Sequence, residues 1–238
     1  MRILLIGYGK MGRTIEQIAK QRGHEIAGVI DVTNHDTLSS YSGANVDAAI
    51  EFTHPESAFK NVAYCLQNNI PVVCGSTGWL EHFAEAKAIC EANNGAFFYA
   101  SNYSVGVNLF FHFNEYIASK MQAYPQFKVA VKEIHHTQKV DKPSGTAITV
   151  VDGIVANYPA KEGWLLAPEQ ADEKISIISE RIGNVVGTHV VRYESDNDTI
   201  ELMHDAQSRT GFAEGAVMAA EWLQNKKGVF GMKDMLNL

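Results

Sequence analysis

The residues best suited to chemistry lie between positions 133 and 147, in the segment EIHHTQKVDKPSGTA. It holds two adjacent histidines, His135 and His136, and two lysines, Lys139 and Lys142. An imidazole and an ammonium group beside a hydride acceptor can polarise it and deliver a proton. Successive side chains of a strand point in opposite directions, so the two histidines need not share a role.

The same segment contains a helix-start signal. Ser144 stands where an N-cap residue is expected, at the start of a helical pattern over 144–158. The first N–H groups of that helix, at Gly145 and Thr146, form an anion site of carboxylate size. Together with the lysines, this indicates a small substrate with two carboxylates. The alternative is a solvated charged loop before a capped helix, and a lone histidine such as His135 is more often structural than catalytic.

Adjacent histidines also raise the question of a metal. No cysteine or acidic residue stands at a ligand-like interval from them, so we expect no bound metal. The three cysteines, Cys65, Cys74 and Cys90, have no C-x-x-C or metal-like spacing. An odd number without a disulfide framework favours reduced thiols and a cytoplasmic protein.

A second candidate site opens the chain, in RILLIGYGKMG. An apolar run of the kind found in buried parallel strands leads into G-x-G-x-x-G, formed by Gly7, Gly9 and Gly12. Between a strand and a helix, this motif binds a dinucleotide pyrophosphate at the helix N-terminus. Asp31 ends the next predicted strand about 20 positions later, as expected for an acid that binds ribose hydroxyls.

The elements that must position these residues alternate over the first hundred positions. Strands are predicted at 3–6, 25–31, 48–53, 71–74 and 96–102, with helices between them. This alternation predicts an α/β fold with a Rossmann-type, doubly wound parallel sheet, whose ligands bind at the carboxyl ends of the strands. Three further loops at such ends leave room for a nicotinamide, although each has ordinary loop composition: Phe52 and Thr53; Gly75, Ser76, Thr77 and Gly78; Ala100, Ser101, Asn102 and Tyr103.

After residue 102 the pattern changes. A helix at 105–121 and an alternating strand at 127–134 precede the histidines, and strands at 173–183, 185–195 and 198–206 precede a final helix at 211–226. We expect residues 1–102, completed by 209–238, to form the dinucleotide-binding domain. Residues 103–208 are expected to form a smaller α+β domain with a mixed sheet. Hinges are expected at 102–104 and 208–210, where Arg209 would be structural.

The composition is that of an ordinary globular protein, with 46% hydrophobic and 20% charged residues among 238. The formal charge of −7 argues against coating nucleic acid. We also expect no membrane partner, because no apolar run approaches the length needed to span a bilayer.

These motifs resemble the dihydrodipicolinate reductase family, also called 4-hydroxy-tetrahydrodipicolinate reductase, of bacterial lysine and diaminopimelate synthesis. The family pattern Glu-x-His-His-x-x-Lys-x-Asp-x-Pro-Ser-Gly-Thr-Ala matches 133–147, and GSTG, SNYSVGVN, RIGNVVGTH and HDAQSRTGFAEGA follow the family's order. The resemblance covers nearly the whole chain. It implies hydride transfer from NADH or NADPH to a dihydrodipicolinate-type ring, giving tetrahydrodipicolinate, with loss of water from a hydroxylated substrate.

The resemblance also implies roles for residues. His135 takes the position of a proton donor or acceptor in the family. Lys139 takes the position of the lysine that protonates the substrate after hydride transfer. With Ser144, the expected substrate-binding residues are His136, Gly145 and Thr146. With the loops above, the expected cofactor-binding residues are Gly7, Tyr8, Gly9, Lys10, Met11, Gly12, Asp31, Phe52, Thr53, Gly75, Ser76, Thr77, Ala100, Ser101, Asn102 and Tyr103.

Family members are usually homotetramers built through the sheet of the substrate domain, so the resemblance implies the same assembly here. Three positions depart from the family: Lys142 and Ser101 replace smaller or different residues, and Glu51 replaces an aspartate. Asp31 is followed by no arginine or lysine over the next four residues. We therefore expect a modest preference for NADH over NADPH, softened by Lys10 as the one nearby cation.

Two other functions remain open. A different two-domain dehydrogenase, acting on amino acids or sugars, would share the glycine loop but leaves the histidine and lysine loop unexplained. A non-catalytic NAD(H)-sensing protein would need a partner module, such as a basic helix-turn-helix, and none is visible in the sequence.

Overall fold

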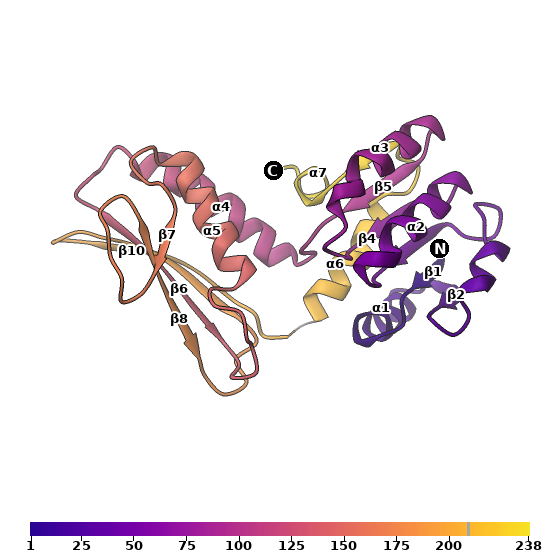
Figure 1. The fold of residues 1–238 in the computed structure, drawn as a ribbon, viewed down its shortest axis with the longest axis horizontal. Helices are drawn as coiled ribbons and strands as arrows, with labels where there is room; N and C mark the ends of the chain where they lie inside the picture. The colour runs from indigo at the N-terminus through magenta and orange to yellow at the C-terminus, as the bar shows by residue number, and fades with distance from the viewer. Residues whose placement is uncertain (209) are drawn as a thin grey trace. The chain divides into compact units, whose positions relative to one another are not determined.

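The computed structural model describes residues 1–208 and 210–238, and its contacts divide the chain into two units (Figure 1). The first unit joins Met1–Val105 to Thr210–Leu238, and the second begins at Gly106 and occupies the sequence between them. Arg209, expected at a hinge, lies outside the described residues. Each unit has a hydrophobic core of its own.

The first unit is built on a parallel sheet with strand order β11-β5-β4-β3-β1-β2. Helices cover both faces, which confirms the predicted doubly wound fold. The strands are β1 (Arg2–Ile6), β2 (Glu25–Ile30), β3 (Ala48–Glu51), β4 (Val72–Cys74), β5 (Ala96–Tyr99) and β11 (Gly228–Phe230). The helices are α1 (Lys10–Gln21), α2 (Pro55–Gln67), α3 (Phe83–Ala92), α6 (Thr210–Trp222) and α7 (Met232–Leu236), with short 3-10 turns η1 (His35–Ser40) and η2 (Leu80–His82).

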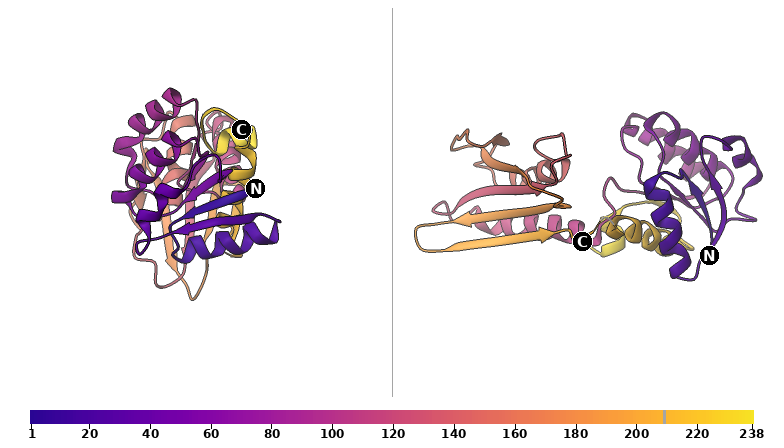
Figure 2. Two further views of the ribbon diagram at one scale, coloured as in Figure 1. Left: turned by 90° about the vertical axis from the view of Figure 1, so that its right-hand side faces the viewer. Right: turned by 90° about the horizontal axis from the view of Figure 1, so that it is seen from below.

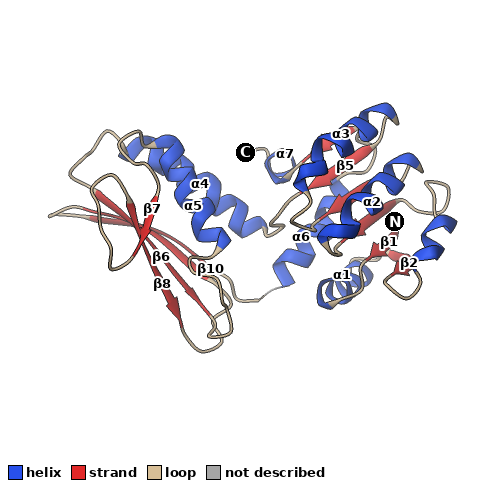
Figure 3. Ribbon diagram, in the orientation of Figure 1, coloured by secondary structure: helices blue, strands red, loops and turns tan. Residues whose placement is uncertain are grey.

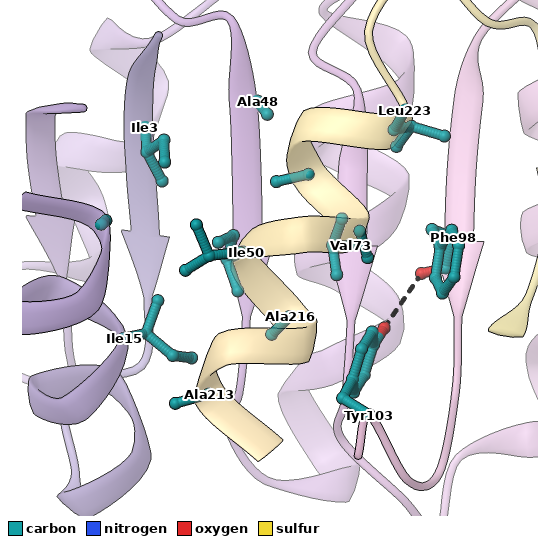
Figure 4. Packing of buried hydrophobic residues seen from close by; sticks show 14 of the residues in the cluster. Ile3, Ile15, Ala48, Ile50, Val73, Phe98, Tyr103, Ala213, Ala216 and Leu223 are labelled. Atoms are coloured by element: carbon teal, nitrogen blue, oxygen red, sulfur yellow. Dashed lines mark hydrogen bonds between the residues drawn. The ribbon is translucent and has the colours of Figure 1, made fainter. Parts of the chain in front are cut away.

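The continuous apolar run of β1 follows from burial on both faces of this sheet. Ile3 and Leu5 pack with residues of α1 and α6, whereas Leu4 and Ile6 pack with residues of α2 and α3. Helix α6 crosses the strands on small side chains such as Ala213 and Ala216 (Figure 4). The segment is rich in alanine and glycine because the helix lies directly against neighbouring backbone, and larger residues would separate the layers.

The C-terminal strand and helix of this unit were not predicted, and neither was η1. After α6 the chain adds β11 beside β5 at the edge of the sheet and ends in α7. A three-residue strand carries too few positions for a periodic pattern, so the sequence offers no signal for it.

The second unit is built on a mixed sheet with strand order β10-β9-β6-β8-β7. This confirms the predicted α+β class with a mixed sheet. Strand β6 (Lys128–His135) is antiparallel to β9 (Thr188–Glu194) and parallel to β8 (Ile175–Arg181). The edge strands are β10 (Thr199–Asp205), which forms a long hairpin with β9 (Figure 2), and β7 (Trp164–Leu166), which was not predicted. Helices α4 (Val105–Met121) and α5 (Gly145–Asn157) lie on one side of the sheet (Figure 3).

Alternation along β6 decides which of its side chains meet the helices. Val129, Val131, Glu133 and His135 are buried, and the residues between them are partly exposed. The candidate histidine therefore lies on the covered face of the sheet, together with an acidic residue two positions earlier.

The other face of this sheet carries a row of side chains across four strands. The register joins Met203 to Val190, Val190 to Lys132 and Lys132 to Ile178. Met203 is 64% exposed and Ile178 is 41% exposed. In the part of the chain described here, no helix combines the length and apolar character that crossing a membrane requires.

Candidate active site

A cavity of about 790 Å³ lies in the first unit at the carboxyl ends of β1 to β4. Twelve of the sixteen predicted cofactor-binding residues line it: Gly7, Tyr8, Gly9, Lys10, Met11, Gly12, Asp31, Phe52, Thr53, Gly75, Ser76 and Thr77. These residues follow four different strands, so the sheet brings them together at one edge.

The glycine loop has the geometry that a dinucleotide pyrophosphate requires. Gly7 adopts φ +97°, and a Cβ there would lie 2.0 Å from the Phe52 carbonyl oxygen. A Cβ at Gly12 would lie 2.1 Å from the Gly7 carbonyl oxygen, so only glycine allows this contact between helix and strand. A Cβ at Gly9, by contrast, would meet nothing within 4 Å. Gly9 caps α1 without a side-chain bond, which leaves the first N–H groups of the helix open to an anion.

Asp31 is held in a fixed orientation at the edge of this cavity. Its Oδ1 accepts hydrogen bonds from the Thr33 hydroxyl, at 2.6 Å, and from the Thr33 N–H, at 2.7 Å. These bonds lower the pKa of the Asp31 carboxyl, so the group stays ionised. Lys60 also lines the cavity, so the prediction that Lys10 is the one nearby cation was wrong. Lys60 comes from α2, which the local sequence around Asp31 could not reveal.

A hydrogen bond connects the loops after β3 and β4, both of which line the cavity. The Thr53 N–H donates to Ser76 Oγ at 2.7 Å, and the Thr53 hydroxyl donates to the buried carboxylate of Glu51. Cys74 Sγ lies 3.0 Å from the other oxygen of Glu51, and burial raises the pKa of this thiol. Glu51 therefore braces the loop that carries Thr53.

The fourth predicted loop does not line the cavity: Ala100, Ser101, Asn102 and Tyr103 are absent from its walls. Tyr103 is 2% exposed, and its hydroxyl donates to the carbonyl oxygen of Cys74. It also lies within hydrogen-bond distance of the Phe98 carbonyl oxygen (Figure 4). Its ring belongs to the core of the unit. The sequence places this residue at a strand end, but only the packing shows that its side chain turns inward.

In the second unit, His135 ends β6 beside a buried carboxylate. Its Nδ1 lies 2.9 Å from Glu133 Oε2, which is an ion-pair distance, although neither atom has a partner in hydrogen-bond geometry among the described residues. Burial opposes ionisation of Glu133, but its polar contacts with His135, Ser144, Ser179 and Arg181 outweigh burial and hold the pKa of the carboxyl well below its usual range. The imidazole thus faces a permanent negative charge.

Lys139 lies in the loop between β6 and α5. Its Nζ is 2.9 Å from Asp141 Oδ1, and its side chain is 23% exposed. Arg181 reaches the same loop from β8, with Nε donating to the Lys139 carbonyl oxygen at 3.2 Å and Nη2 donating to the Asp141 carbonyl oxygen. His136 is half-buried, and Lys142 is exposed.

Ser144 begins α5 as predicted. Its Oγ accepts from the Ala147 N–H at 3.2 Å, and its own N–H donates to Glu133 Oε1 at 3.1 Å. By helix geometry, the N–H groups of Gly145 and Thr146 have no acceptor within the helix. A Cβ at Gly145 would meet nothing within 4 Å, so the helix end opens to space in which an anion can approach.

His189 completes this cluster from β9. Its Nε2 lies 3.2 Å from Ser144 Oγ, and its ring meets the His135 ring edge to face at 5.1 Å. Burial and the neighbouring His135 lower the pKa of His189 to about 4. One histidine of the cluster is therefore neutral at physiological pH.

The sequence did not single out Glu133, Arg181 or His189. The argument against a metal overlooked Glu133, because Glu133, His135 and His189 offer ligand atoms within 4.8 Å of one another. The spacing of Glu133 and His135 was a usable signal, since residues two apart on a strand share a face. Arg181 and His189 come from other strands, and only the sheet register brings them near.

Comparisons with known proteins agree over the whole chain. Family models described as dihydrodipicolinate reductase, N-terminus, and dihydrodipicolinate reductase, C-terminus, match residues 1–103 and 106–236. A 4-hydroxy-tetrahydrodipicolinate reductase of Christiangramia forsetii is 49% identical over 100% of this chain and 98% of its own length. A dipicolinate-bound dihydrodipicolinate reductase from Paenisporosarcina sp. TG-14 is 25% identical, with a TM-score of 0.78 and 98% of each chain covered.

Dehydrogenases of other specificity share the fold alone. The DAP dehydrogenase of C. glutamicum, in complex with DAP, has a TM-score of 0.51 at 13% identity, covering 98% of this chain and 92% of its own.

Proposed function

The chain belongs to the dihydrodipicolinate reductase family, and we propose that it reduces a dihydrodipicolinate-type substrate to tetrahydrodipicolinate with hydride from NADH or NADPH. It is an NAD(P)H-dependent oxidoreductase of lysine and diaminopimelate biosynthesis. The observation that carries this conclusion is the match of one family model to residues 1–103 and of the other to 106–236. The second match contains the histidine and lysine loop.

The first unit is proposed to hold the cofactor. The open helix end at Gly9 suits the pyrophosphate, and the cavity after β3 and β4 suits the nicotinamide, which supplies the hydride when bound. Both Thr33 bonds use Oδ1 of Asp31, so Oδ2 is the oxygen offered to the ribose hydroxyls. The same charge repels a 2′-phosphate and supports a preference for NADH, which Lys10 and Lys60 keep modest.

The second unit is proposed to bind a small dicarboxylate. The N–H groups of Gly145 and Thr146 suit one carboxylate, with Ser144 and His136 as further contacts. After hydride adds to one atom of the substrate double bond, the other atom holds an electron pair. Lys139 gives this atom its proton, and His135 donates or accepts a proton at the same substrate. The relative from Paenisporosarcina, solved with dipicolinate bound, supports a dicarboxylate.

The test is the loss of absorbance at the NADH band when protein, NADH and the candidate substrate are mixed. We expect turnover with the dihydrodipicolinate-type substrate and none with a free amino acid or a sugar. Turnover of an amino acid or a sugar in its place would identify one of the other dehydrogenases. Tight NADH binding with no turnover of any of the three would favour a sensing protein.

We also propose a homotetramer assembled through the uncovered sheet face of the second unit. The support is the row Met203, Val190, Lys132 and Ile178, in which two apolar side chains are exposed. A cytoplasmic location is proposed as well, in keeping with three free and buried cysteines.

A further inference from the structure

We propose that Glu133 and Arg181 are positioning residues that hold the proton-transfer groups of the second unit in register with its anion site. This inference rests on the proposed function, because it concerns how the same site is kept in its working geometry. The groups held are the His135 imidazole, the backbone that carries Lys139 and the first turn of α5.

Glu133 is the centre of the arrangement, and its two carboxylate oxygens face different groups. It is 0% exposed. Oε1 accepts from the Ser144 N–H and from Arg181 Nη2, each at 3.1 Å, and also from the Ser179 hydroxyl. Oε2 faces His135. Because the carboxylate is buried and three donors from different segments meet at Oε1, it acts as an internal anchor.

The carboxylate decides which nitrogen of His135 carries a proton. A negative carboxylate oxygen repels a lone pair, so its approach to 2.9 Å favours the tautomer that carries the proton on Nδ1. Nε2 is then the nitrogen that exchanges a proton with a ligand. His189, the other titratable group against this ring, stays neutral at physiological pH and does not compete for Glu133 as a cation.

Arg181 extends the arrangement to the loop. Its side chain is 9% exposed, and it joins Glu133 to the carbonyl oxygens of Lys139 and Asp141. The loop backbone on both sides of Val140 is thereby tied to the sheet, although the Val140 side chain itself is 95% exposed. A buried ion pair is poor evidence for stability as such, since apolar residues of similar volume often replace one without loss. The Glu133–Arg181 pair contacts three segments that carry candidate site residues. We therefore infer that the pair fixes the positions of these residues.

Glu133→Gln is the sharpest test, because it preserves shape and removes the charge. The new amide can donate to Nδ1 and so favours the opposite tautomer of His135. We expect kcat to fall about tenfold to a hundredfold, as for a catalytic group held out of place, while the Kd for NADH stays within about twofold of the wild type. Glu194→Gln is the matched control, since it removes a carboxylate from an exposed Glu–Arg pair of the same sheet at 2.7 Å.

A double-mutant cycle with His135→Ala tells positioning from a general structural role. If Glu133 acts chiefly through the imidazole, Glu133→Gln lowers kcat much less in the His135→Ala background than in the wild type, and the remaining effect reports its contacts with Arg181 and α5. An equal fall in kcat in both backgrounds would overturn the proposal. Should Glu133→Gln fail to fold, Glu133→Asp keeps the charge opposite Arg181 but shortens the reach to Nδ1, and the same cycle applies.

Two further outcomes are decisive. Activity that is lost on treatment with EDTA and restored by Zn²⁺ would show that Glu133, His135 and His189 hold a metal, and would overturn the positioning role. We expect EDTA to have no effect.

A wild type without turnover would contradict the proposed function itself. An active wild type together with an equally active Glu133→Gln would contradict this inference alone.

Discussion

At the scale of single residues, Lys139 forms an ion pair within its own loop. Its ammonium group lies 2.9 Å from the Asp141 carboxylate, and the hydrogen bond from Lys139 holds the pKa of that carboxyl below its usual range. The side chain is only 23% exposed, so the pair is partly shielded from water. The ammonium group of Lys139, the proposed proton source, is therefore held beside a charged partner.

Lys139→Ala should nearly abolish turnover without preventing NADH binding. Removing a general acid lowers the rate by about a hundredfold to ten-thousandfold. Single-turnover kinetics and NADH fluorescence titration measure the two effects separately. Lys128→Ala, at the exposed start of β6, is the control. A Lys139→Ala enzyme with near-normal kcat would show that the proton comes from elsewhere.

Asp31 should set the choice between the two cofactors. We expect the wild type to favour NADH and Asp31→Ala to shift the ratio of kcat/KM values towards NADPH by about tenfold, which corresponds to one or two hydrogen bonds. Asp36→Ala, an exposed acid of η1, should leave the ratio unchanged. Either a wild type that favours NADPH or an unaltered ratio in Asp31→Ala would contradict the ribose assignment.

His189 should make stability depend on pH. Unfolded histidine takes up its proton near pH 6.5, whereas burial and His135 lower the pKa of His189 to about 4 in the folded chain. Between these values the unfolded state binds more protons than the folded state. The free energy of unfolding therefore decreases as the pH is lowered from 6.5 to about 4, by about 3 kcal/mol in all.

Urea unfolding between pH 7.5 and about 5 tests this, because carboxyl groups with a usual pKa of 4.5, such as Glu133, contribute little above pH 5. His189→Gln should flatten the fall by about 2 kcal/mol over this range. Parallel curves for the wild type and His189→Gln would mean that His189 takes up its proton in the folded state as readily as in the unfolded one.

At the scale of elements, the connection from β8 to β9 closes over the imidazole. A Cβ on Gly187 would lie 3.0 Å from His135 Nε2, closer than side chains normally pack. Glu133 holds the other side of the same ring. The ring is therefore confined between a strand and a loop that come from different parts of the sequence.

Gly187→Ala should displace the imidazole by a few tenths of an ångström and lower kcat about threefold to tenfold, because catalytic rates depend steeply on alignment. The melting temperature should change little. Gly211→Ala near the start of α6, where a new Cβ would lie 4.0 Å from the Ser104 hydroxyl oxygen, is the control and should leave kcat intact. An unchanged kcat in Gly187→Ala would mean that the ring position is not critical.

At the scale of the whole molecule, the uncovered face of the second sheet should carry the assembly. Met203→Lys and Ile178→Lys would place a charge among the apolar contacts of the row and should convert the tetramer to smaller species. Light scattering coupled to size exclusion measures the mass of each variant. Wild-type protein that elutes as a monomer, or a tetramer that survives both substitutions, would contradict an interface on this face.

The sequence by itself determined the fold class and the family. The apolar run before Gly7, the helix behind it and the strand ending at Asp31 are local patterns, and local patterns follow directly from periodicity and from the turn that glycine permits. The N-cap at Ser144 was equally readable, because its bond to the Ala147 N–H spans three residues. Short segments such as β7 and β11 escaped because three residues carry no period.

Tertiary structure decided how the candidate groups are held. Arg181 and His189 reach Glu133 from β8 and β9, through a strand register that no local pattern encodes. Packing also turned the Tyr103 ring into the core and brought Lys60 to the cavity of the first unit. The physical reason is the same in each case: the place of the side chain is set by segments distant in sequence, and their approach depends on the folding of the whole unit.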